Sequence, residues 1–450
     1  MTRARTRDGL VWLTVLALMV GAGGAVVRPR PVMILAFQPV AGGDDGWLGE
    51  GIAETLFLAA QATPALLPLD RSRIAQALQA AGGDPAVPPT DKVVLVAARA
   101  LKVESVMYGD YQRTPEGGVT VTPHLLDVKT GESQTLEPLV GKPGQLLETQ
   151  AEVIQAYAKS LKLGLKPDEL QRLVAAAKPT TNVTAFEAYA RARHSAIKGG
   201  QDGNEGAAEL LARAVEVDPT FAVAHYHLGV VHLALGNRWK AAAQFRASTQ
   251  VDANLADPYK ALGDLFMSSP RRLYDQAIEA YQKAVSLRPH FAEAQVGLGD
   301  ARAAKGDNEA AIAHYQKALA LDPLNARVHY ALGKIQYGEK GLYFEAVSSY
   351  KKAVELDPYF VDARMGLGEM YEDKGLYKDA IAEYRKVLEV DPKHTGARYN
   401  LALAYEKVDP KEAIVQWERY IELASQVATE KEWVDTARQH LKKLRDRQPQ

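Results

Sequence analysis

Apolar and small residues recur at a nearly constant interval through the C-terminal half of the chain. The clearest marker is a leucine followed by a glycine, and a Leu-Ala pair continues the series. The pairs are Leu228-Gly229, Leu262-Gly263, Leu298-Gly299, Leu332-Gly333, Leu367-Gly368 and Leu401-Ala402. An interval of roughly 34 residues is typical of a helical repeat array, in which each unit buries its apolar face against its neighbours.

A second set of positions supports the same alignment. When Gly229 is the eighth residue of a unit, an alanine and then an aromatic residue recur in its second half. These pairs are Ala241 and Phe245, Ala277 and Tyr281, Ala311 and Tyr315, Ala346 and Tyr350, and Ala380 and Tyr384. From the second of these units onward, a proline follows each pair and predicts the end of a helix. The insertions that the alignment needs, at residues 268–272 and 338–341, fall in turns, where added length is tolerated.

This pattern resembles the tetratricopeptide repeat, and the resemblance covers more than half of the chain. It implies two antiparallel helices per unit, brought close together by small residues and spaced from the next unit by the aromatic ring. We expect an array of about seven units over residues 183–425, beginning with a degenerate one. A last helix over 430–447 should cap the array with Trp433, Ala437 and Leu441 facing inward.

The N-terminal third has a different pattern, in which short apolar runs alternate with helical periodicity. We expect strands at residues 32–37, 65–69, 105–113, 119–128 and 133–139, and helices at 47–62, 71–81, 91–101 and 144–163. Asp91 is the predicted N-cap of the third helix. This order predicts a mixed α/β domain with a covered sheet, and with the repeats an α+β protein whose second part is an all-α superhelical solenoid.

Several segments of this domain resemble the TolB amino-terminal-type domain and the related FlgO-like domain of bacterial envelope proteins. The matching segments are Phe37-Gln38-Pro39, residues 47–56, residues 106–111, and the Asp127 to Gly131 turn. The likeness covers about 110 residues. It implies a non-catalytic interaction domain and carries no catalytic residue across.

The first thirty residues indicate where the protein resides. Arg3, Arg5 and Arg7 precede an apolar run from Leu10 to Val27, which is typical of a bacterial export signal or a membrane anchor. A cleavage site after Ala25 and a retained anchor both fit the run. In either case we expect the bulk of the chain outside the cytoplasm, in the periplasm or anchored to the inner membrane. If the run is retained, the first domain lies against the lipid headgroups.

Composition narrows the choice of partners and chemistry. The net charge of -1 and the lack of a long basic block argue against nucleic-acid binding, which needs clustered Lys and Arg. No cysteine is present, so disulfides and thiolate metal sites are excluded. We divide the chain into a leader (1–30), an α/β domain (31–165), a linker or helix (166–182), the repeats (183–425) and a capping segment (426–450).

Three motifs suggest chemistry, and each has a simpler structural interpretation that we prefer. Asp44 and Asp45 precede a helix without the further ligands of a cation loop. His225, His227 and His232 lack the spacing and the nearby acid of a metal site. Gly297-Leu-Gly299 lies within a predicted helix and not after a strand, so it is a packing motif and not a dinucleotide loop. We therefore predict no catalytic residue, cofactor or metal.

In this repeat family the first helix of each unit lines a concave groove through its second, fifth, ninth and twelfth residues. Carried over to this chain, those positions predict a partner groove of mixed apolar and charged character. Its residues are Val223, Tyr226, Val230, Leu233, Asp257, Lys260, Asp264, Met267, Glu293, Val296, Asp300, Ala303, Arg327, Tyr330, Lys334, Tyr337, Asp362, Met365, Glu369, Glu372, Tyr399 and Leu403.

The sequence thus favours a non-catalytic cell-envelope scaffold that binds protein partners through this groove. We expect the bound segment to be extended or helical, with an apolar part and mixed charges. The alternative is an enzyme or small-molecule sensor with a ligand site in the α/β domain, in which the repeats act as recruiter.

Overall fold

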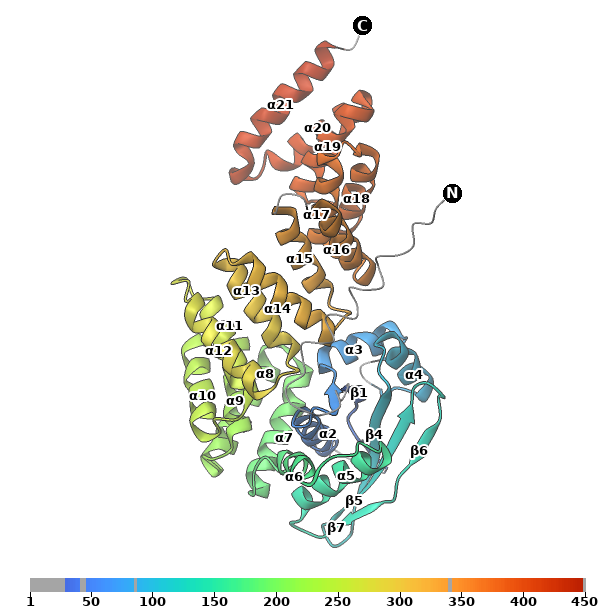
Figure 1. The fold of residues 1–450 in the computed structure, drawn as a ribbon, viewed down its shortest axis with the longest axis vertical. Helices are drawn as coiled ribbons and strands as arrows, with labels where there is room; N and C mark the ends of the chain where they lie inside the picture. The colour runs from blue at the N-terminus through green and yellow to red at the C-terminus, as the bar shows by residue number, and fades with distance from the viewer. Residues whose placement is uncertain (1–28, 41–45, 85–86, 339–341, 448–450) are drawn as a thin grey trace, which may run out of the picture. The chain divides into compact units, whose positions relative to one another are not determined.

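A computed structural model describes residues 29–40, 46–84, 87–338 and 342–447. It confirms an α+β protein in which a small sheet domain is followed by a helical solenoid (Figure 1). Residues 1–28 of the predicted leader (1–30) and the loop with Asp44 and Asp45 lie outside the described residues, whereas Arg30 belongs to the first strand. None of the helices in the described ranges has the length and hydropathy needed to cross a bilayer. The chain divides into two compact units, residues 1–261 and 262–450.

The sheet lies in the first unit and mixes parallel and antiparallel pairing. Its strands are β1 (Arg30–Ile34), β2 (Gln38–Pro39), β3 (Leu66–Pro68), β4 (Ser105–Arg113), β5 (Val119–Asp127), β6 (Ser133–Thr135) and β7 (Leu139–Gly141). The strand order is β3-β1-β4-β5-β6, with β2 on β4 and β7 on β5. β1 is parallel to β3 and β4, whereas β4 and β5 form an antiparallel hairpin. The segment predicted as one strand at 133–139 is thus two short strands on β5.

Helices cover both faces of this sheet. They are α2 (Gly46–Gln61), α3 (Arg71–Ala80), α4 (Asp91–Ala100), α5 (Leu146–Ser160) and α6 (Pro167–Ala176). Val32 and Ile34 of β1 face the core shared with α2 and α5, and Met33 between them faces the core shared with α3 and α4. Successive side chains of a strand point to opposite faces, so one apolar strand serves both cores. The predicted cap was wrong by one residue, because Thr90 is the N-cap of α4 and Asp91 begins the helix.

The repeats form antiparallel helix pairs. In the first unit these helices are α7 (Val183–Lys198), α8 (Gly200–Val217), α9 (Ala222–Ala234) and α10 (Arg238–Val251), and α11 (Ala256–Met267) contains the division between the units. The second unit continues with α12 (Tyr274–Leu287), α13 (Ala292–Ala304), α14 (Asn308–Leu321), α15 (Ala326–Gly338), α16 (Tyr343–Leu356), α17 (Val361–Asp373), α18 (Tyr377–Val390), α19 (Thr395–Val408), α20 (Pro410–Ala424) and α21 (Lys431–Asp446).

In the pairs from α9–α10 to α17–α18, a glycine of the first helix contacts an aromatic ring of the second. A Cβ atom added to Gly299 would lie 2.4 Å from the Tyr315 ring, and one added to Gly368 would lie 2.4 Å from the Tyr384 ring. A Cβ on Gly297 would lie 2.5 Å from Tyr281 of the preceding pair. The Gly-Leu-Gly motif is therefore a packing motif, in which one glycine faces each neighbouring ring.

The last helix differs in part from its prediction. Ala437 and Leu441 of α21 are buried, together with Val434 and Leu444. Trp433, predicted to face inward, is 55% exposed. One edge of its ring meets Tyr399, with the ring centroids 5.3 Å apart. The buried face of α21 is therefore centred on Val434, and Trp433 covers the rim of the core.

The glycine–aromatic contact gives a test of the fold. Replacing Gly299 by valine places methyl groups where the Tyr315 ring lies, so we expect a loss of about 1–3 kcal/mol in stability. The matched control is Gly338→Val, also within the compact unit of residues 262–450, because nothing lies within 4 Å of a Cβ built there. Thermal unfolding followed by circular dichroism measures both. Equal melting temperatures for the two variants would contradict the contact.

Candidate partner-binding surface and the junction of the α/β domain with the repeats

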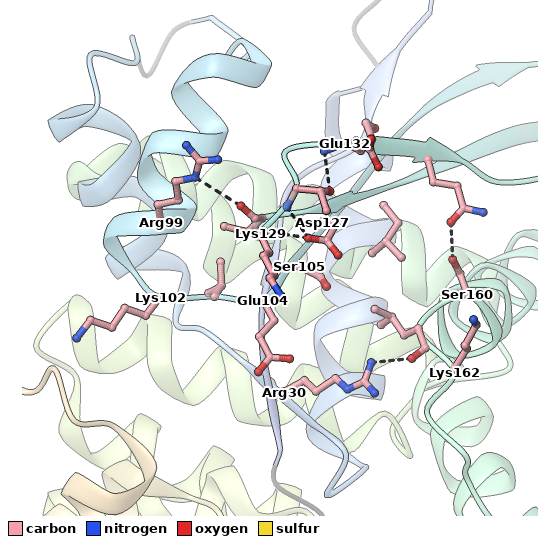
Figure 2. Close-up of a pocket in the computed structure, with 17 residues that line it drawn as sticks. Arg30, Arg99, Lys102, Glu104, Ser105, Asp127, Lys129, Glu132, Ser160 and Lys162 are labelled. Atoms are coloured by element: carbon pink, nitrogen blue, oxygen red, sulfur yellow. Dashed lines mark hydrogen bonds between the residues drawn. The ribbon is translucent and has the colours of Figure 1, made fainter.

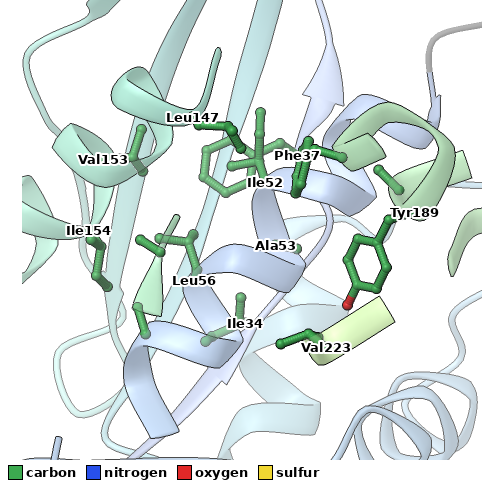
Figure 3. Packing of buried hydrophobic residues seen from close by; sticks show 14 of the residues in the cluster. Ile34, Phe37, Ile52, Ala53, Leu56, Leu147, Val153, Ile154, Tyr189 and Val223 are labelled. Carbon is green, nitrogen blue, oxygen red and sulfur yellow. The ribbon is translucent and has the colours of Figure 1, made fainter. Parts of the chain in front are cut away.

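The α/β domain and the first repeats share one core within the first unit. The same buried cluster contains Phe37 before β2, Ile52 of α2, Ile154 of α5, Tyr189 of α7 and Val223 of α9 (Figure 3). α2 packs directly on α7, and a Cβ added to Gly51 would lie 2.9 Å from the Cβ of Ala190. No gap in apolar packing marks the predicted boundary near residue 165.

One buried carboxylate lies at this junction. Glu54 of α2 is 2% exposed and accepts a hydrogen bond from the Tyr189 hydroxyl at 3.0 Å. It also accepts one from the Arg193 guanidinium at 3.3 Å, and both of these partners lie on α7. His227 Nε2 of α9 is 3.3 Å from the same carboxylate, and Arg71 Nη1 is 3.8 Å from it. A single side chain therefore joins the sheet domain to the first helices of two repeat pairs.

The charge state of this cluster follows from its surroundings. Burial by itself raises the pKa of Glu54, but the positive charges of Arg193 and Arg71 outweigh it and lower the pKa to about 2. Burial, with the charge of Arg193, lowers the pKa of His227 to about 3, so this histidine is neutral at pH 7. His227 Nε2 therefore lies beside the Glu54 carboxylate as part of a neutral imidazole, and the contact is not an ion pair.

Sequence reasoning missed this junction. Glu54 lies beside the apolar stripe of its helix, and its partners Tyr189 and Arg193 are 135 and 139 residues away in the chain. The predicted groove residue Val223 is buried in the shared core, so it is not available to a partner. Of the two other histidines considered as metal ligands, His225 contacts Gln244 at 2.7 Å and His232 is half-buried. The described residues contain no group of three or more His, Asp or Glu side chains placed to hold a metal ion.

The remaining predicted groove residues of the first unit are accessible. Tyr226, Leu233, Asp257 and Lys260 are half-buried, and Val230 is exposed. These side chains lie on α9 and α11, the first helices of their pairs. They form a mixed apolar and charged surface.

In the second unit, most of the predicted residues are also accessible. Val296 is the exception, because it is buried in the core of its pair. The exposed or half-buried residues are Asp264, Met267, Glu293, Asp300, Ala303, Arg327, Tyr330, Lys334, Tyr337, Asp362, Met365, Glu369, Glu372, Tyr399 and Leu403. Some of these side chains contact each other. Arg327 shows such a contact, since its guanidinium lies 2.6 Å from the Asp300 carboxylate of the neighbouring first helix.

Several of these acids hold the repeat pairs together. The Tyr281 hydroxyl donates to Asp264 at 2.7 Å, and the Tyr315 hydroxyl donates to Asp300 at 2.7 Å. The Tyr384 hydroxyl donates to Glu372 at 3.0 Å in the same way. In these three pairs the tyrosine of the second helix thus reaches an acid of its first helix.

The most distinctive part of this surface lies where α15 and α17 meet. We define the acidic–aromatic patch as Tyr330, Tyr337, Glu369, Glu372 and Asp373. The Tyr337 hydroxyl donates to Asp373 at 2.6 Å, and this bond and burial raise the pKa of Tyr337 to about 12. Burial and the neighbouring acids of α17 raise the pKa values of Glu369 and Glu372. Like charges are therefore concentrated on one helix turn beside two aromatic rings.

Comparison with known proteins identifies the class of the repeats. A family model described as "TPR repeat" matches residues 274–306, 299–340 and 368–409. Models described as "Tetratricopeptide repeat" match residues 197–254 and 326–360. The chain therefore carries tetratricopeptide repeats, as predicted. Proteins with such repeats mediate protein–protein interactions.

The curated relatives match part of this chain. The small glutamine-rich tetratricopeptide repeat-containing protein 2 of Mycosarcoma maydis is 33% identical over 121 residues, which are 27% of this chain and 34% of that protein. Protein IFIT1 homolog B of Homo sapiens is 28% identical over 155 residues, 34% of this chain and 30% of that protein. The chain thus spans about a third of the length of these curated relatives. The crystal structure of MamA is 31% identical, with a TM-score of 0.34, covering 37% of this chain and 95% of that one.

The junction predicts a strong effect of one isosteric substitution. Glu54→Gln removes the counter-charge of the half-buried Arg193, so we expect a loss of about 3 kcal/mol in the stability of the first unit. Hydrogen exchange of α2 and α7 in the full chain measures the loss. The control is Glu50→Gln, because Glu50 is partly exposed and pairs with Arg71 at 2.6 Å. Similar exchange in both variants would contradict the proposed importance of Glu54.

The same carboxylate also predicts a pH dependence. The pKa of Glu54 is lowered from 4.5 to about 2 in the folded protein, so the unfolded chain binds its proton first as the pH falls. Stability from Glu54 is complete above about pH 4.5 and is lost as the pH falls toward 2. Urea unfolding should show that the free energy of unfolding falls less over this pH window in Glu54→Gln than in the unaltered protein. An identical loss in both would assign the pH dependence to other groups.

Proposed function

We propose that the protein is a non-catalytic adaptor of the cell envelope, which binds a polypeptide partner along the first helices of its repeats. The tetratricopeptide repeats support binding of a protein partner, and the accessible first-helix residues supply the surface. The basic start and the apolar run from Leu10 to Val27 support an exported or membrane-anchored location. The likeness of residues 31–165 to the TolB amino-terminal-type domain supports an interaction role for the α/β domain.

The observation that carries this proposal is the acidic–aromatic patch. Glu369 and Glu372 have raised pKa values because they are partly desolvated and lie close to each other and to Asp373. A cation placed beside them relieves this repulsion, and the ring faces of Tyr330 and Tyr337 add cation–π attraction. Lysine or arginine side chains of a partner have this chemistry. The patch therefore favours a bound segment in which basic and apolar residues alternate.

Neighbouring side chains extend this recognition beyond the patch. Met365 of α17 is half-buried and offers an adaptable apolar contact beside the acids. Lys334 of α15 is exposed and adds a positive charge on the helix that carries both patch tyrosines. A segment with apolar anchors, several basic residues and an acidic residue opposite Lys334 complements this surface. The mixed charges give specificity and association rate more than affinity.

Binding of defined peptides tests the patch. Fluorescence anisotropy with the full chain compares short basic–apolar peptides with acidic–apolar peptides of equal length. We expect the basic set to bind more tightly and the variant Glu369→Gln/Glu372→Gln to weaken that binding on the order of tenfold at low salt. The matched control is Glu345→Gln/Glu355→Gln, which removes the same charge from exposed positions of α16.

The pH dependence of the same assay supplies an independent readout. Because the pKa values of Glu369 and Glu372 are raised, their negative charge disappears at a higher pH than for ordinary carboxylates. Basic peptides should therefore dissociate as the medium is mildly acidified, while the control variant shows the same profile as the unaltered protein. Equal binding of acidic and basic peptides, or equal weakening by the control variant, would reject the patch as the binding surface.

A further inference from the structure

An open cleft of about 1370 Å³ lies in the α/β domain of the first unit, and all its lining residues belong to that domain. Figure 2 shows that its labelled residues come from the start of β1, the end of α4, the start of β4, the turn after β5 and the end of α5. Five basic side chains line it, against three carboxylates. The basic residues are Arg30, Arg99, Lys102, Lys129 and Lys162, and the acids are Glu104, Asp127 and Glu132.

The positive charges of this cleft are not neutralised by its acids. Within the described ranges, none of the five basic side chains forms an ion pair. Arg30 Nη1 donates to the Leu161 carbonyl at 2.7 Å, which orients the guanidinium and leaves its charge in place. Asp127 accepts from the backbone N–H groups of Lys129 and Thr130 at 2.8 and 3.0 Å, so its charge is engaged by the turn.

Two of the lysines occupy positions that ordinarily favour glycine. Lys102 and Lys162 directly follow the C-caps of α4 and α5 and have φ angles of 55° and 50°. Glycine adopts this left-handed conformation without steric cost, whereas a side chain does not. Both lysines are exposed, so burial of their side chains does not account for the choice. The chain thus carries a charged side chain on each side of the cleft where a smaller residue fits more easily.

The cleft lies close in the sequence to the apolar run of the proposed leader. Arg30 is the first residue of β1 and lines the cleft, and the apolar run ends at Val27. Three residues span at most about 10 Å, even when fully extended. On the proposed envelope location, with that run retained in the bilayer, the cleft lies within about one Debye length of the headgroup phosphates. Basic side chains at that distance are attracted to anionic lipids.

We propose that this cleft binds the phosphate groups of anionic lipid headgroups and holds the α/β domain against the membrane surface. Arg30 and Arg99 are oriented by backbone carbonyls and present planar donors to phosphate oxygens. Lys102, Lys129 and Lys162 add mobile positive charges around the opening. The inference rests on the membrane location in the proposed function, and it adds the class of lipid that the domain recognises.

Vesicle flotation of the full chain tests this inference. Phosphatidylcholine vesicles measure binding through the apolar run alone, and vesicles containing phosphatidylglycerol add the contribution of the cleft. We expect the anionic lipid to increase binding about tenfold or more, and the variant Lys102→Gln/Lys129→Gln/Lys162→Gln to remove most of that increase. The control Lys92→Gln/Lys142→Gln/Lys178→Gln removes the same charge from exposed sites of the same unit and should keep the increase.

The remaining outcomes separate this inference from the proposed location. No binding to phosphatidylcholine vesicles would reject membrane anchoring, whereas an increase with phosphatidylglycerol would still support the cleft. Equal loss in both triple variants would overturn the cleft in favour of diffuse surface charge. Inorganic phosphate, compared with chloride at equal ionic strength, distinguishes the sources of phosphate. Displacement by phosphate alone, without any preference for anionic vesicles, would overturn the lipid assignment.

Discussion

The close contact between a glycine and an aromatic ring determines how the repeats pack. Tyr281 lies between Gly263 of its own pair and Gly297 of the next, and Tyr350 lies between Gly333 and Gly366 in the same manner. A ring so enclosed fixes both the approach of two helices and the spacing to the following pair. On each first helix, the face opposite the glycine contact keeps most of its side chains accessible. The surface proposed for binding another protein therefore depends on glycine–aromatic contacts inside the array.

The repeats could be predicted because their constraints are local and recur. Each glycine, alanine and ring appears several times at one spacing, so one alignment located the helices. The junction at Glu54 could not be predicted, since α7 and α9 lie far from α2 in the sequence and one acid carries no periodic signal. The same limitation explains Val223 and Val296, which occupy groove positions in the alignment but are buried by neighbours that periodicity does not reveal.

Acidic side chains of the first helices serve different purposes along the second unit. Asp264 and Asp300 accept hydrogen bonds from tyrosines, and Asp300 also binds Arg327, so their charges are largely used within the protein. Glu369 and Glu372 lie beside each other with raised pKa values, and only Glu372 accepts from a tyrosine. Sequence alone assigned Asp264, Asp300 and Glu369 to one groove without this distinction. The geometry separates acids that maintain the fold from acids that retain the capacity to attract a cation.

The attachment of α2 to α7 and α9 limits which parts of the array are free to diversify. A substitution on the inner side of α7 or α9 must suit Glu54 and its companions as well as its own helix pair. The later helix pairs have buried cores formed by their own and neighbouring repeat helices. Exchange of whole helix pairs between related proteins, in nature or by engineering, should therefore succeed most readily in the later part of the chain. Such an exchange can change what the array binds and leaves the packing of α2 on α7 and α9 intact.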